Sequence, residues 1–280
     1  DLHRVDRRQR QMCIRDRDGT QRYICKECGK RFTALTNTIF DSKKIPISEW
    51  IEYLLHLFEF HSINSTAYDN RNSPTTGKYW LIKTFEVLKG IQNDVVLDGT
   101  VYLDETYFTK VRSKLVTKDG KKLRGISRNK IGVGVACNET KSIFIVTGTS
   151  KPSRKSTKET YSQHIARGSV LVHDDEHSHS ILIEELELES IVYPTAETKE
   201  LSDKDNPLYP VNNLHLLLKQ FIRNHGAYDR EHLQDWLNLF WFIMNEPKDK
   251  YDKVLKFIEM AVLSPKKVRY RDAMSSKHSK

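Results

Sequence analysis

The sequence has few cysteines and lacks any long apolar run. Its 280 residues include four cysteines, which are Cys13, Cys25, Cys28 and Cys137. So few cysteines exclude a disulfide-stapled scaffold and favour a reducing, cytosolic setting. No apolar run approaches the ~18 residues that a membrane span needs, and no signal-peptide pattern is present, so we expect no membrane partner. The chain is long enough for one sizeable core and a small satellite domain.

Acidic residues are scarce relative to basic ones. There are 37 Asp and Glu against 46 Lys and Arg, which gives a formal net charge of +9 at pH 7. This excess predicts a polyanionic partner. Nucleic acid is the first expectation, with an anionic membrane surface or a ribosome as rivals.

The first 44 residues contain only part of a recognisable motif. Residues 1–17 are arginine-rich and the chain starts with Asp rather than Met, so we interpret them as a non-native or disordered segment of a fragment. Residues 18–44 include YICKECGKRF, a Cys-x-x-Cys knuckle formed by Cys25 and Cys28. A structural Zn²⁺ needs four ligands, and only Cys13 lies upstream. We expect half of a truncated zinc ribbon, with an incomplete Zn²⁺ ligand set. A surface turn with two free thiols is the alternative.

Residues 45–92 are predicted to be helical. The apolar residues of the first segment recur at helical spacing, and they are Ile47, Trp50, Ile51, Leu54, Leu55 and Phe58. Ser48 is its expected N-cap. A short helix within residues 62–70 and a third within residues 73–90 follow. Three short helices with a polar turn fit a helix-turn-helix DNA-binding region, and a plain helical spacer is the alternative.

From residue 95 to 248 the pattern changes to strands that alternate with helices. The predicted strands are 100–108, 130–137, 142–148, 169–173 and 190–194. The predicted helices are 155–165, 178–188, 211–225 and 230–245, with a polar loop over 195–208. Three consecutive strands suit an antiparallel meander, and the alternating part suits parallel additions. This is the order of a ribonuclease H-like α/β fold, a mixed sheet flanked by helices. Residues 249–280 are expected to form a basic C-terminal helix and tail.

Two strands of this predicted sheet carry acids. Asp104 and Glu105 are adjacent within strand 100–108, so their side chains point to opposite faces and only one can serve a shared site. The pattern leaves open which one. Asp174 directly follows strand 169–173, where an open α/β sheet presents its ligands. Two neighbouring carboxylates repel each other unless a divalent cation lies between them, and hard oxygen ligands favour Mg²⁺ or Mn²⁺.

The predicted helix 211–225 is amphipathic. The apolar residues that we expect to be buried are Leu214, Leu217, Leu218 and Phe221. Asn212, His215 and Lys219 form a polar stripe on another face. A solvated surface is the ordinary explanation of such a stripe. Its position directly downstream of the fifth strand is also where a third metal ligand would be delivered.

Five ordered blocks of the sequence resemble a known family. They are CKECGKRF, LDETYF, RGISRNKIGV, VHDDEHSH, and VNNLHLLLKQF followed by LQDWLNLFWF. Over about residues 23–246 the chain resembles bacterial insertion-sequence transposases of the DDE superfamily. It resembles in particular the group with an N-terminal zinc ribbon and an Asp-Asp-Asn-Lys or Asp-Asp-Glu-Lys core.

The resemblance implies phosphoryl transfer on DNA with two metal ions. The catalytic core would consist of Asp104, rather than Glu105, with Asp174, Asn212 and Lys219. The two acids and Asn212 would hold Mg²⁺ or Mn²⁺ ions ~3.5–4 Å apart, while Lys219 would contact a phosphate or the attacking oxygen. Water would attack at the element end, and the freed 3′-hydroxyl would then attack target DNA. The alternative third ligands are Asn213 and His215.

The other polar residues of LVHDDEHSH receive lesser roles in this interpretation. Asp175 and Glu176 are expected to lie in a solvated turn. His173, His177 and His179 are expected to be polar packing residues or substrate neighbours rather than zinc ligands.

Two basic runs flank the proposed site. Residues 110–130 hold nine Lys or Arg and one acid, Asp119, and are expected to form a hairpin arm, while residues 151–158 form a second patch. The predicted DNA-binding residues are Lys110, Arg112, Lys114, Lys121, Lys122, Arg124, Arg128, Lys130, Arg154 and Lys155. A charge run is usually a solvated surface. Two runs beside one metal site favour a DNA channel whose affinity falls steeply with salt.

The implied partner is double-stranded DNA, as both element ends and target. The resemblance implies a homodimer or larger synaptic complex, acting in the bacterial cytoplasm in association with the nucleoid. Two other functions compete with this one: a ribonuclease H-like nuclease or resolvase that cuts without joining, and a DNA-binding regulator with a decayed core.

Overall fold

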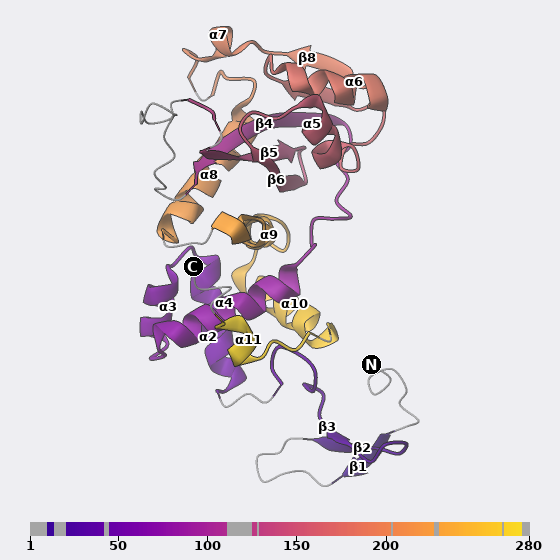
Figure 1. Cartoon of the computed structure of the whole chain (residues 1–280), viewed down its shortest axis with the longest axis vertical. Coiled ribbons are helices and arrows are strands. Elements are labelled where there is room, and N and C mark those ends of the chain that lie inside the picture. The colour runs from indigo at the N-terminus through magenta and orange to yellow at the C-terminus, as the bar shows by residue number, and fades with distance from the viewer. Residues whose placement is uncertain are drawn as a thin grey trace. The chain divides into compact units, whose positions relative to one another are not determined.

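The chain folds into two compact units. The computed structural model describes residues 10–13, 21–41, 45–110, 125–127, 129–202, 204–226, 230–264 and 266–275 (Figure 1). The units are Asp1–Val87 together with Pro247–Lys280, called here the helical unit, and Leu88–Glu246, called the sheet unit. Within the described part of the chain, every helix is too short or too polar to cross a bilayer.

The sheet unit is built on five strands in the order β6-β5-β4-β7-β8. They are β4 (Thr100–Thr109), β5 (Lys130–Cys137), β6 (Ser142–Thr149), β7 (Val170–His173) and β8 (Glu189–Val192). β4, β5 and β6 form an antiparallel meander, β7 lies parallel to β4, and β8 lies parallel to β7. This strand order is that of the ribonuclease H-like fold, so the predicted fold class is confirmed.

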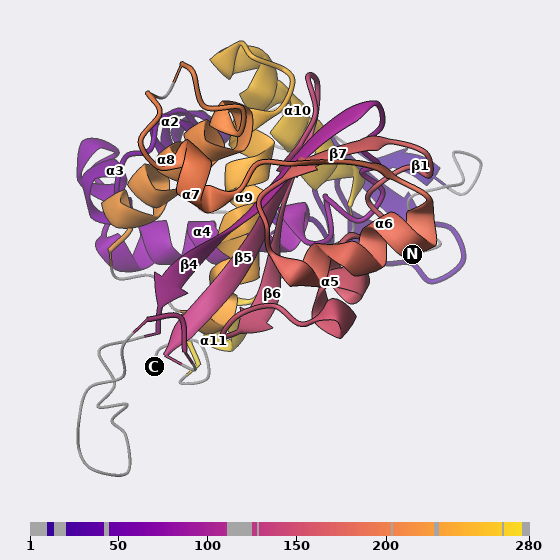
Figure 2. The same cartoon turned by 90° about the horizontal axis from the view of Figure 1, so that it is seen from above.

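Helices cover both faces of this sheet (Figure 2). α5 (Arg154–Tyr161) and α6 (Ser180–Leu186) lie on one side, with α8 (Tyr209–Asn224) and α9 (Leu233–Met244) on the other. Because both faces are covered, β5 reads as a nearly continuous apolar run, and all its residues after Lys130 are buried. Gly134 is required on this strand, since a Cβ there would collide with the Tyr161 hydroxyl.

One hydrophobic core cluster of the sheet unit lies between the sheet and α5 and α6, and Phe144, Phe221 and Phe240 are buried together on the α8 and α9 side. The fully buried members of the first cluster include Leu97, Val101, Leu103, Ala136, Ile143, Tyr161, Leu171 and Leu182. Two segments differ from the sequence prediction. The predicted helix over 178–188 begins with the 3₁₀ turn η2 (His177–His179), and the predicted loop 195–208 contains the short helix α7 (Thr195–Thr198). A further 3₁₀ turn, η3 (Arg230–His232), precedes α9.

The helical unit contains a small antiparallel sheet at its N-terminal end. Its strands are β1 (Arg10–Cys13), β2 (Arg22–Cys25) and β3 (Arg31–Phe32), in sequence order. Tyr23 and Phe32 stack with ring centroids 5.4 Å apart beside the Cys25 turn.

The remainder of this unit is helical and comes from both ends of the chain. Its helices are α2 (Ile47–Phe58), α3 (Ile63–Asp69), α4 (Pro74–Leu88), α10 (Lys250–Leu263) and α11 (Tyr270–Ala273). Trp50 and Trp80 stack at 4.4 Å in its core, and Phe257 of α10 packs edge-on against Phe58 of α2. The described part of the predicted C-terminal helix and tail, residues 249–264 and 266–275, thus belongs to the helical unit.

One predicted helix start is wrong. α2 begins at Ile47 rather than after Ser48, and its N-cap is Pro46, which provides no side-chain cap. Proline fixes φ near its helical value and lacks an N–H, so it is well suited to the helix start that Ser48 was expected to supply. The next helix follows the usual rule, because the Ser62 hydroxyl accepts a hydrogen bond from the Ser65 N–H.

Candidate active site

The register of two parallel strands brings two aspartates together. Leu103 of β4 pairs with His173 of the parallel strand β7. The residue that follows each of them in the chain is an aspartate, Asp104 after Leu103 and Asp174 after His173. Asp104 remains inside β4, whereas Asp174 is the first residue after β7. The two carboxyl groups therefore lie at neighbouring positions where β7 ends.

Burial and like charge both act on this pair. Burial, reinforced by the charges of Asp174 and Glu105, raises the pKa of Asp104 to about 7. Burial also raises the pKa of Asp174, although the Glu176 N–H and the nearby His179 oppose that shift. Each side chain still keeps about a quarter of its surface exposed, 25% for Asp104 and 24% for Asp174. Ionisation of both aspartates therefore costs free energy, yet both side chains remain accessible to solvent and to ions.

Glu105 occupies the opposite face of β4. Its Oε1 accepts a 2.9 Å hydrogen bond from the Tyr161 hydroxyl, and both carboxylate oxygens lie 3.3 Å from His179 Nε2. The side chain is 3% exposed. Glu105 therefore makes its hydrogen bonds inside the protein, unlike Asp104 and Asp174, whose side chains are partly exposed.

His179 links Glu105 to Asp174. Its Nδ1 lies 3.8 Å from Asp174 Oδ1 and 3.1 Å from His173 Nδ1. Burial disfavours the imidazolium, but the hydrogen bond to Glu105 and the surrounding carboxylates outweigh burial and raise the pKa of His179. Burial and the neighbouring His179 lower the pKa of His173 to about 4. One histidine of the pair therefore favours the proton and the other stays neutral.

The rest of the turn after β7 faces solvent. Asp175 is exposed and accepts a 3.3 Å hydrogen bond from the Thr195 hydroxyl. Glu176 is 20% exposed and pairs with Lys151 at 3.1 Å. His177 is exposed as well.

Helix α8 packs on β4 and β5 and brings a buried histidine to Asp104. His215 Nδ1 lies 3.7 Å from Asp104 Oδ2, while its buried Nε2 has no hydrogen-bond partner among the described residues. Burial and the nearby charge of Lys219 lower the pKa of His215 to about 3. Asn212 and Asn213 are half-buried on the first turn of α8, and Lys219 is exposed.

The prediction of which face of α8 is buried was wrong, because the observed buried face is rotated by part of a turn. The buried residues of α8 are Val211, His215, Leu218, Phe221 and Ile222. Leu214 and Leu217 are only half-buried, and His215 belongs to the packed face rather than to a solvated stripe. The apolar residues of this helix surround most of its circumference, with Leu216 63% exposed, so their pattern does not define one face.

The second basic run lies against acidic residues of the turn after β7 and of α6. Lys151 pairs with Glu176, Arg154 with Glu184 at 2.6 Å, and Lys158 with Glu185 at 2.5 Å. Lys155 is 85% exposed, and its one ion pair with a described residue is to Glu159 at 3.8 Å. The patch is therefore partly neutralised within the protein.

The first basic run is only partly described. Lys110 follows β4 directly and Lys130 is the first residue of β5, both are half-buried, and Lys130 donates a hydrogen bond to the Thr109 hydroxyl. Six predicted DNA-binding residues lie outside the described residues: Arg112, Lys114, Lys121, Lys122, Arg124 and Arg128.

The Cys-x-x-Cys knuckle forms a turn after β2. Cys25 is buried and Cys28 is exposed, and the Cys28 backbone N–H lowers the pKa of the Cys25 thiol. Among the described residues no group of three metal-binding side chains includes either cysteine. Cys13 lies on β1 opposite Arg22, but its side chain is outside the described residues. Within the described part of the chain, the knuckle therefore offers two thiol ligands of the four that a structural Zn²⁺ site needs.

Comparison with known proteins found several solved structures that are similar to this chain. A pre-cleavage Mos1 transpososome is 14% identical, covers 81% of this chain and 80% of its own, and gives a TM-score of 0.30. A simian T-cell lymphotropic virus intasome in complex with a PP2A regulatory subunit is 8% identical, with coverages of 67% and 66% and a TM-score of 0.33. The Mos1 transposase catalytic domain with raltegravir and Mg is 17% identical, with coverages of 68% and 94% and a TM-score of 0.31.

No family model matches the sequence, and no curated protein does. At TM-scores this low, the strand order described above remains the basis of the fold assignment.

Sequence reasoning missed the buried network on the far side of β4. Nothing in the pattern connects Glu105 with Tyr161 and His179, since they come from three separate elements. A signal for Tyr161 existed in Gly134, because a glycine in the middle of an apolar strand often marks the close approach of another group. The sequence named His215 only as an alternative third ligand and did not predict its burial beside Asp104.

Proposed function

We propose that the chain is a DNA transposase that transfers phosphoryl groups with bound divalent cations. One observation supports this most: Asp104 and Asp174 lie side by side at the end of β7, and burial together with their repulsion raises the pKa of Asp104 to about 7. A buried pair of this kind is stabilised by a cation between the carboxylates. The resemblance of the five sequence blocks points to the same chemistry.

The donor set fits Mg²⁺ or Mn²⁺. Both aspartates offer hard carboxylate oxygens and each is partly open to solvent, as such ions require for their water and substrate ligands. When bound, the ions would polarise the scissile phosphate and stabilise the attacking and leaving oxygens. The protein's own part is to hold these carboxylates in register and to place Lys219 where a phosphate can approach.

The third ligand is a choice among residues of α8. The resemblance names Asn212, whose amide oxygen suits Mg²⁺ but adds no charge. His215 is the residue of α8 whose side chain lies near Asp104, with Nδ1 3.7 Å from Oδ2, but an imidazole suits Mg²⁺ less well than an amide oxygen does. Asn212→Ala, Asn213→Ala and His215→Ala separate these, because loss of the true ligand raises the metal concentration needed for half-maximal cleavage more than either other substitution does.

We further propose that the chain acts on double-stranded DNA, as a homodimer or larger synaptic complex. Lys110 and Lys130 flank the arm between β4 and β5, and that arm carries most of the basic residues predicted to contact phosphates. Arg154 would need to leave Glu184 to bind DNA, so it is a weaker candidate than Lys155. The helical region of α2 to α4 is the proposed reader of the element ends.

A cleavage and joining assay tests this function. The substrates are the terminal repeats recovered from DNA flanking the gene, either intact or pre-cleaved to expose the 3′-hydroxyl, with a plasmid target and Mg²⁺ or Mn²⁺. Wild-type protein should cleave and join, and Asp104→Asn and Asp174→Asn should do neither. Asp175→Asn is the matched control, since it removes an exposed acid next to Asp174.

The same assay separates the rivals. Cleavage without joining of the pre-cleaved end would identify a nuclease or resolvase. Binding of the repeats without metal-dependent cleavage would identify a DNA-binding regulator with a decayed core.

A further inference from the structure

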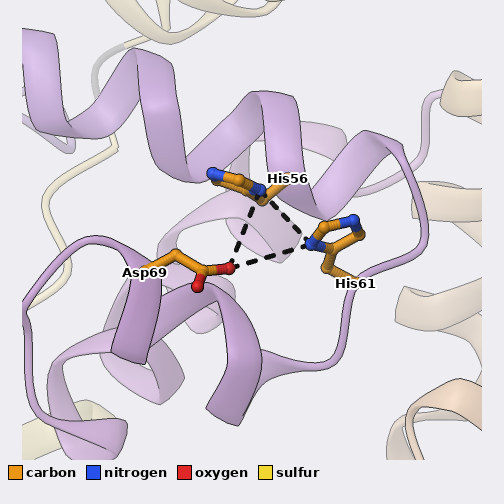
Figure 3. Close-up of side chains that lie close together, drawn as sticks. All are labelled: His56, His61 and Asp69. Carbon is orange, nitrogen blue, oxygen red and sulfur yellow. Dashed lines mark hydrogen bonds and ion pairs between the residues drawn. The ribbon is translucent and has the colours of Figure 1, made fainter.

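The helical unit contains a second group of metal-binding side chains, far in sequence from the candidate active site. His56 Nδ1 and His61 Nδ1 lie 3.3 Å apart, and Asp69 Oδ2 lies 4.0 Å from the first and 3.9 Å from the second (Figure 3). Figure 3 shows all three ligand atoms pointing toward one another. We name these three residues the helix-end cluster.

The backbone at the end of α2 brings the two histidines together. The Phe60 N–H donates to the Leu57 carbonyl and the His61 N–H to the His56 carbonyl, which is the pair of bonds of a Schellman motif. Phe60 takes the left-handed conformation, with φ 66°, that such a motif requires and that glycine usually supplies. The motif ordinarily brings an apolar pair together at the two positions held here by His56 and His61. A pair of imidazoles at this place is therefore a departure from the usual apolar contact.

The third member comes from the next helix. Ser62 caps α3 immediately after His61, and Asp69 is the last residue of that helix. A carboxylate at the negative end of a helix is unfavourably placed, and the last turn of α3 holds no basic residue. A bound cation beside Asp69 would remove this conflict.

We propose that the helix-end cluster is a Zn²⁺ site that fastens the end of α2 to the end of α3. An ion at the centre of the three ligand atoms would lie about 2.2 Å from each, close to the distances for nitrogen and carboxylate ligands of zinc. Two imidazoles and one carboxylate suit this borderline ion, whereas Mg²⁺ and Ca²⁺ prefer oxygen ligands alone. The side chains are 26%, 40% and 38% exposed, so a water molecule has access to a fourth position.

The site does not depend on the proposed transposase activity, because none of its residues belongs to the sheet unit. Its effect would be mechanical: the ion fixes the angle between two helices of the region predicted to read DNA. Loss of Zn²⁺ would leave the cleavage chemistry of Asp104 and Asp174 untouched and would change the order of the loop from Glu59 to Ser62.

A zinc titration of the full chain without a histidine tag tests the proposal. The background carries Cys25→Ser, Cys28→Ser and Asp174→Asn, which remove ligands of the other candidate sites. Calorimetry with ZnCl₂ should show one zinc per chain that His61→Ala and Asp69→Asn each weaken at least ~10-fold, because each removes one of only three protein ligands. Glu52→Gln is the matched control, since it removes an exposed acid of α2 outside the cluster. Equal zinc affinity in the background and in His61→Ala would overturn the proposal.

A measurement on the unsubstituted chain avoids dependence on variants that fail to fold. On addition of ZnCl₂, the imidazole ¹⁵N resonances of His56 and His61 should shift at Nδ1, and MgCl₂ should leave them unchanged. Resonances that titrate with pH but ignore ZnCl₂ would show that the cluster is a hydrogen-bonded proton network and not a metal site.

Discussion

Two groups of potential metal ligands among the described residues differ in how much they destabilise the protein when no metal is bound. The sheet cluster, which consists of Asp104 and Asp174, holds two carboxylates in a mostly buried place beside the charge of Glu105. The helix-end cluster has one carboxylate, two imidazoles that can be neutral, and side chains between 26% and 40% exposed. Like charges in a buried site are destabilising until a cation compensates them. We therefore infer that the sheet cluster destabilises the protein when no metal is bound, as a site kept for its function can. The helix-end cluster, in contrast, stabilises the protein when an ion binds.

Substitution of Asp104 by asparagine should give the largest effect and the clearest contrast. Cleavage should fall about 1000-fold, because loss of a ligand weakens a metal clamp that contributes several kcal/mol to the transition state. The free energy of unfolding in metal-free buffer at pH 8 should rise by roughly 2 kcal/mol, because the pKa of Asp104 lies above its unfolded value and its ionisation opposes folding. Urea unfolding and a cleavage assay measure the two effects.

The sign of this stability gain can be checked with pH. The folded pKa of about 7 exceeds the ordinary value of 3.8, so the wild type loses stability as pH rises through this window. The gain from Asp104→Asn should thus be full above pH 7 and absent below about pH 4. A variant that is less stable than the wild type at pH 8 would contradict the view that the acids of the sheet cluster are strained without metal.

Glu105→Gln should have the opposite profile to Asp104→Asn. It should lower the free energy of unfolding by about 1–3 kcal/mol, because it disturbs the buried bonds to Tyr161 and His179. Cleavage at a temperature where the variant is folded should fall much less than in Asp104→Asn. If Glu105→Gln abolished cleavage in a fully folded protein, Glu105 and not Asp104 would be the metal ligand.

His225→Phe tests how a buried histidine of the sheet unit, rather than its acids, makes stability depend on pH. Burial lowers the pKa of His225 to about 4, so between pH 6.5 and 4 the unfolded chain binds one proton that the folded chain does not. Stability is therefore lost as pH falls through this window, and the variant should reduce that slope by about 1.4 kcal/mol per pH unit. Thermal unfolding at pH 5 and pH 7 measures it. An unchanged slope would mean that His225 gains a proton without cost.

Zinc should give the smallest effect, confined to the helical unit. A tenfold excess of Zn²⁺ over its dissociation constant adds about 1.4 kcal/mol by mass action, and hence a few degrees in Tm. His61→Ala should remove this increment and Glu52→Gln should retain it. A zinc-induced rise in Tm that persists in His61→Ala would place the ion elsewhere.

The sheet and its two aspartates were predictable from the sequence for physical reasons. A strand such as KIGVGVAC, apolar on both faces, belongs in a sheet covered on both sides, and the alternation that follows requires parallel additions. Strand order then fixes the neighbours, and Asp174 follows its strand directly. The different surroundings of Asp104 and Glu105 were not predictable from pattern, because they depend on Tyr161 and His179 reaching one face of β4.

The other features depend on tertiary contacts that leave no periodic signal. α8 carries apolar residues on most sides, so the burial of His215 follows from its neighbour Asp104 rather than from spacing. The cations of residues 151–158 look free in the sequence, but acids of the turn after β7 and of α6 neutralise three of them. The helix-end cluster requires both a left-handed Phe60 and the direction of α3, and neither is encoded in the spacing of His56, His61 and Asp69.

The helical unit is assembled from two segments that leave the ribosome far apart in time. α2 to α4 emerge before the whole sheet unit, and α10, whose Phe257 packs against Phe58, emerges after it. At ordinary synthesis rates the roughly 160 intervening residues take about 10–30 s. During that interval the part of α2 around Phe58 lacks its partner α10, so the nascent chain is open there to chaperones and to other nascent copies. The sheet unit, by contrast, is continuous in sequence and can complete its core before translation ends.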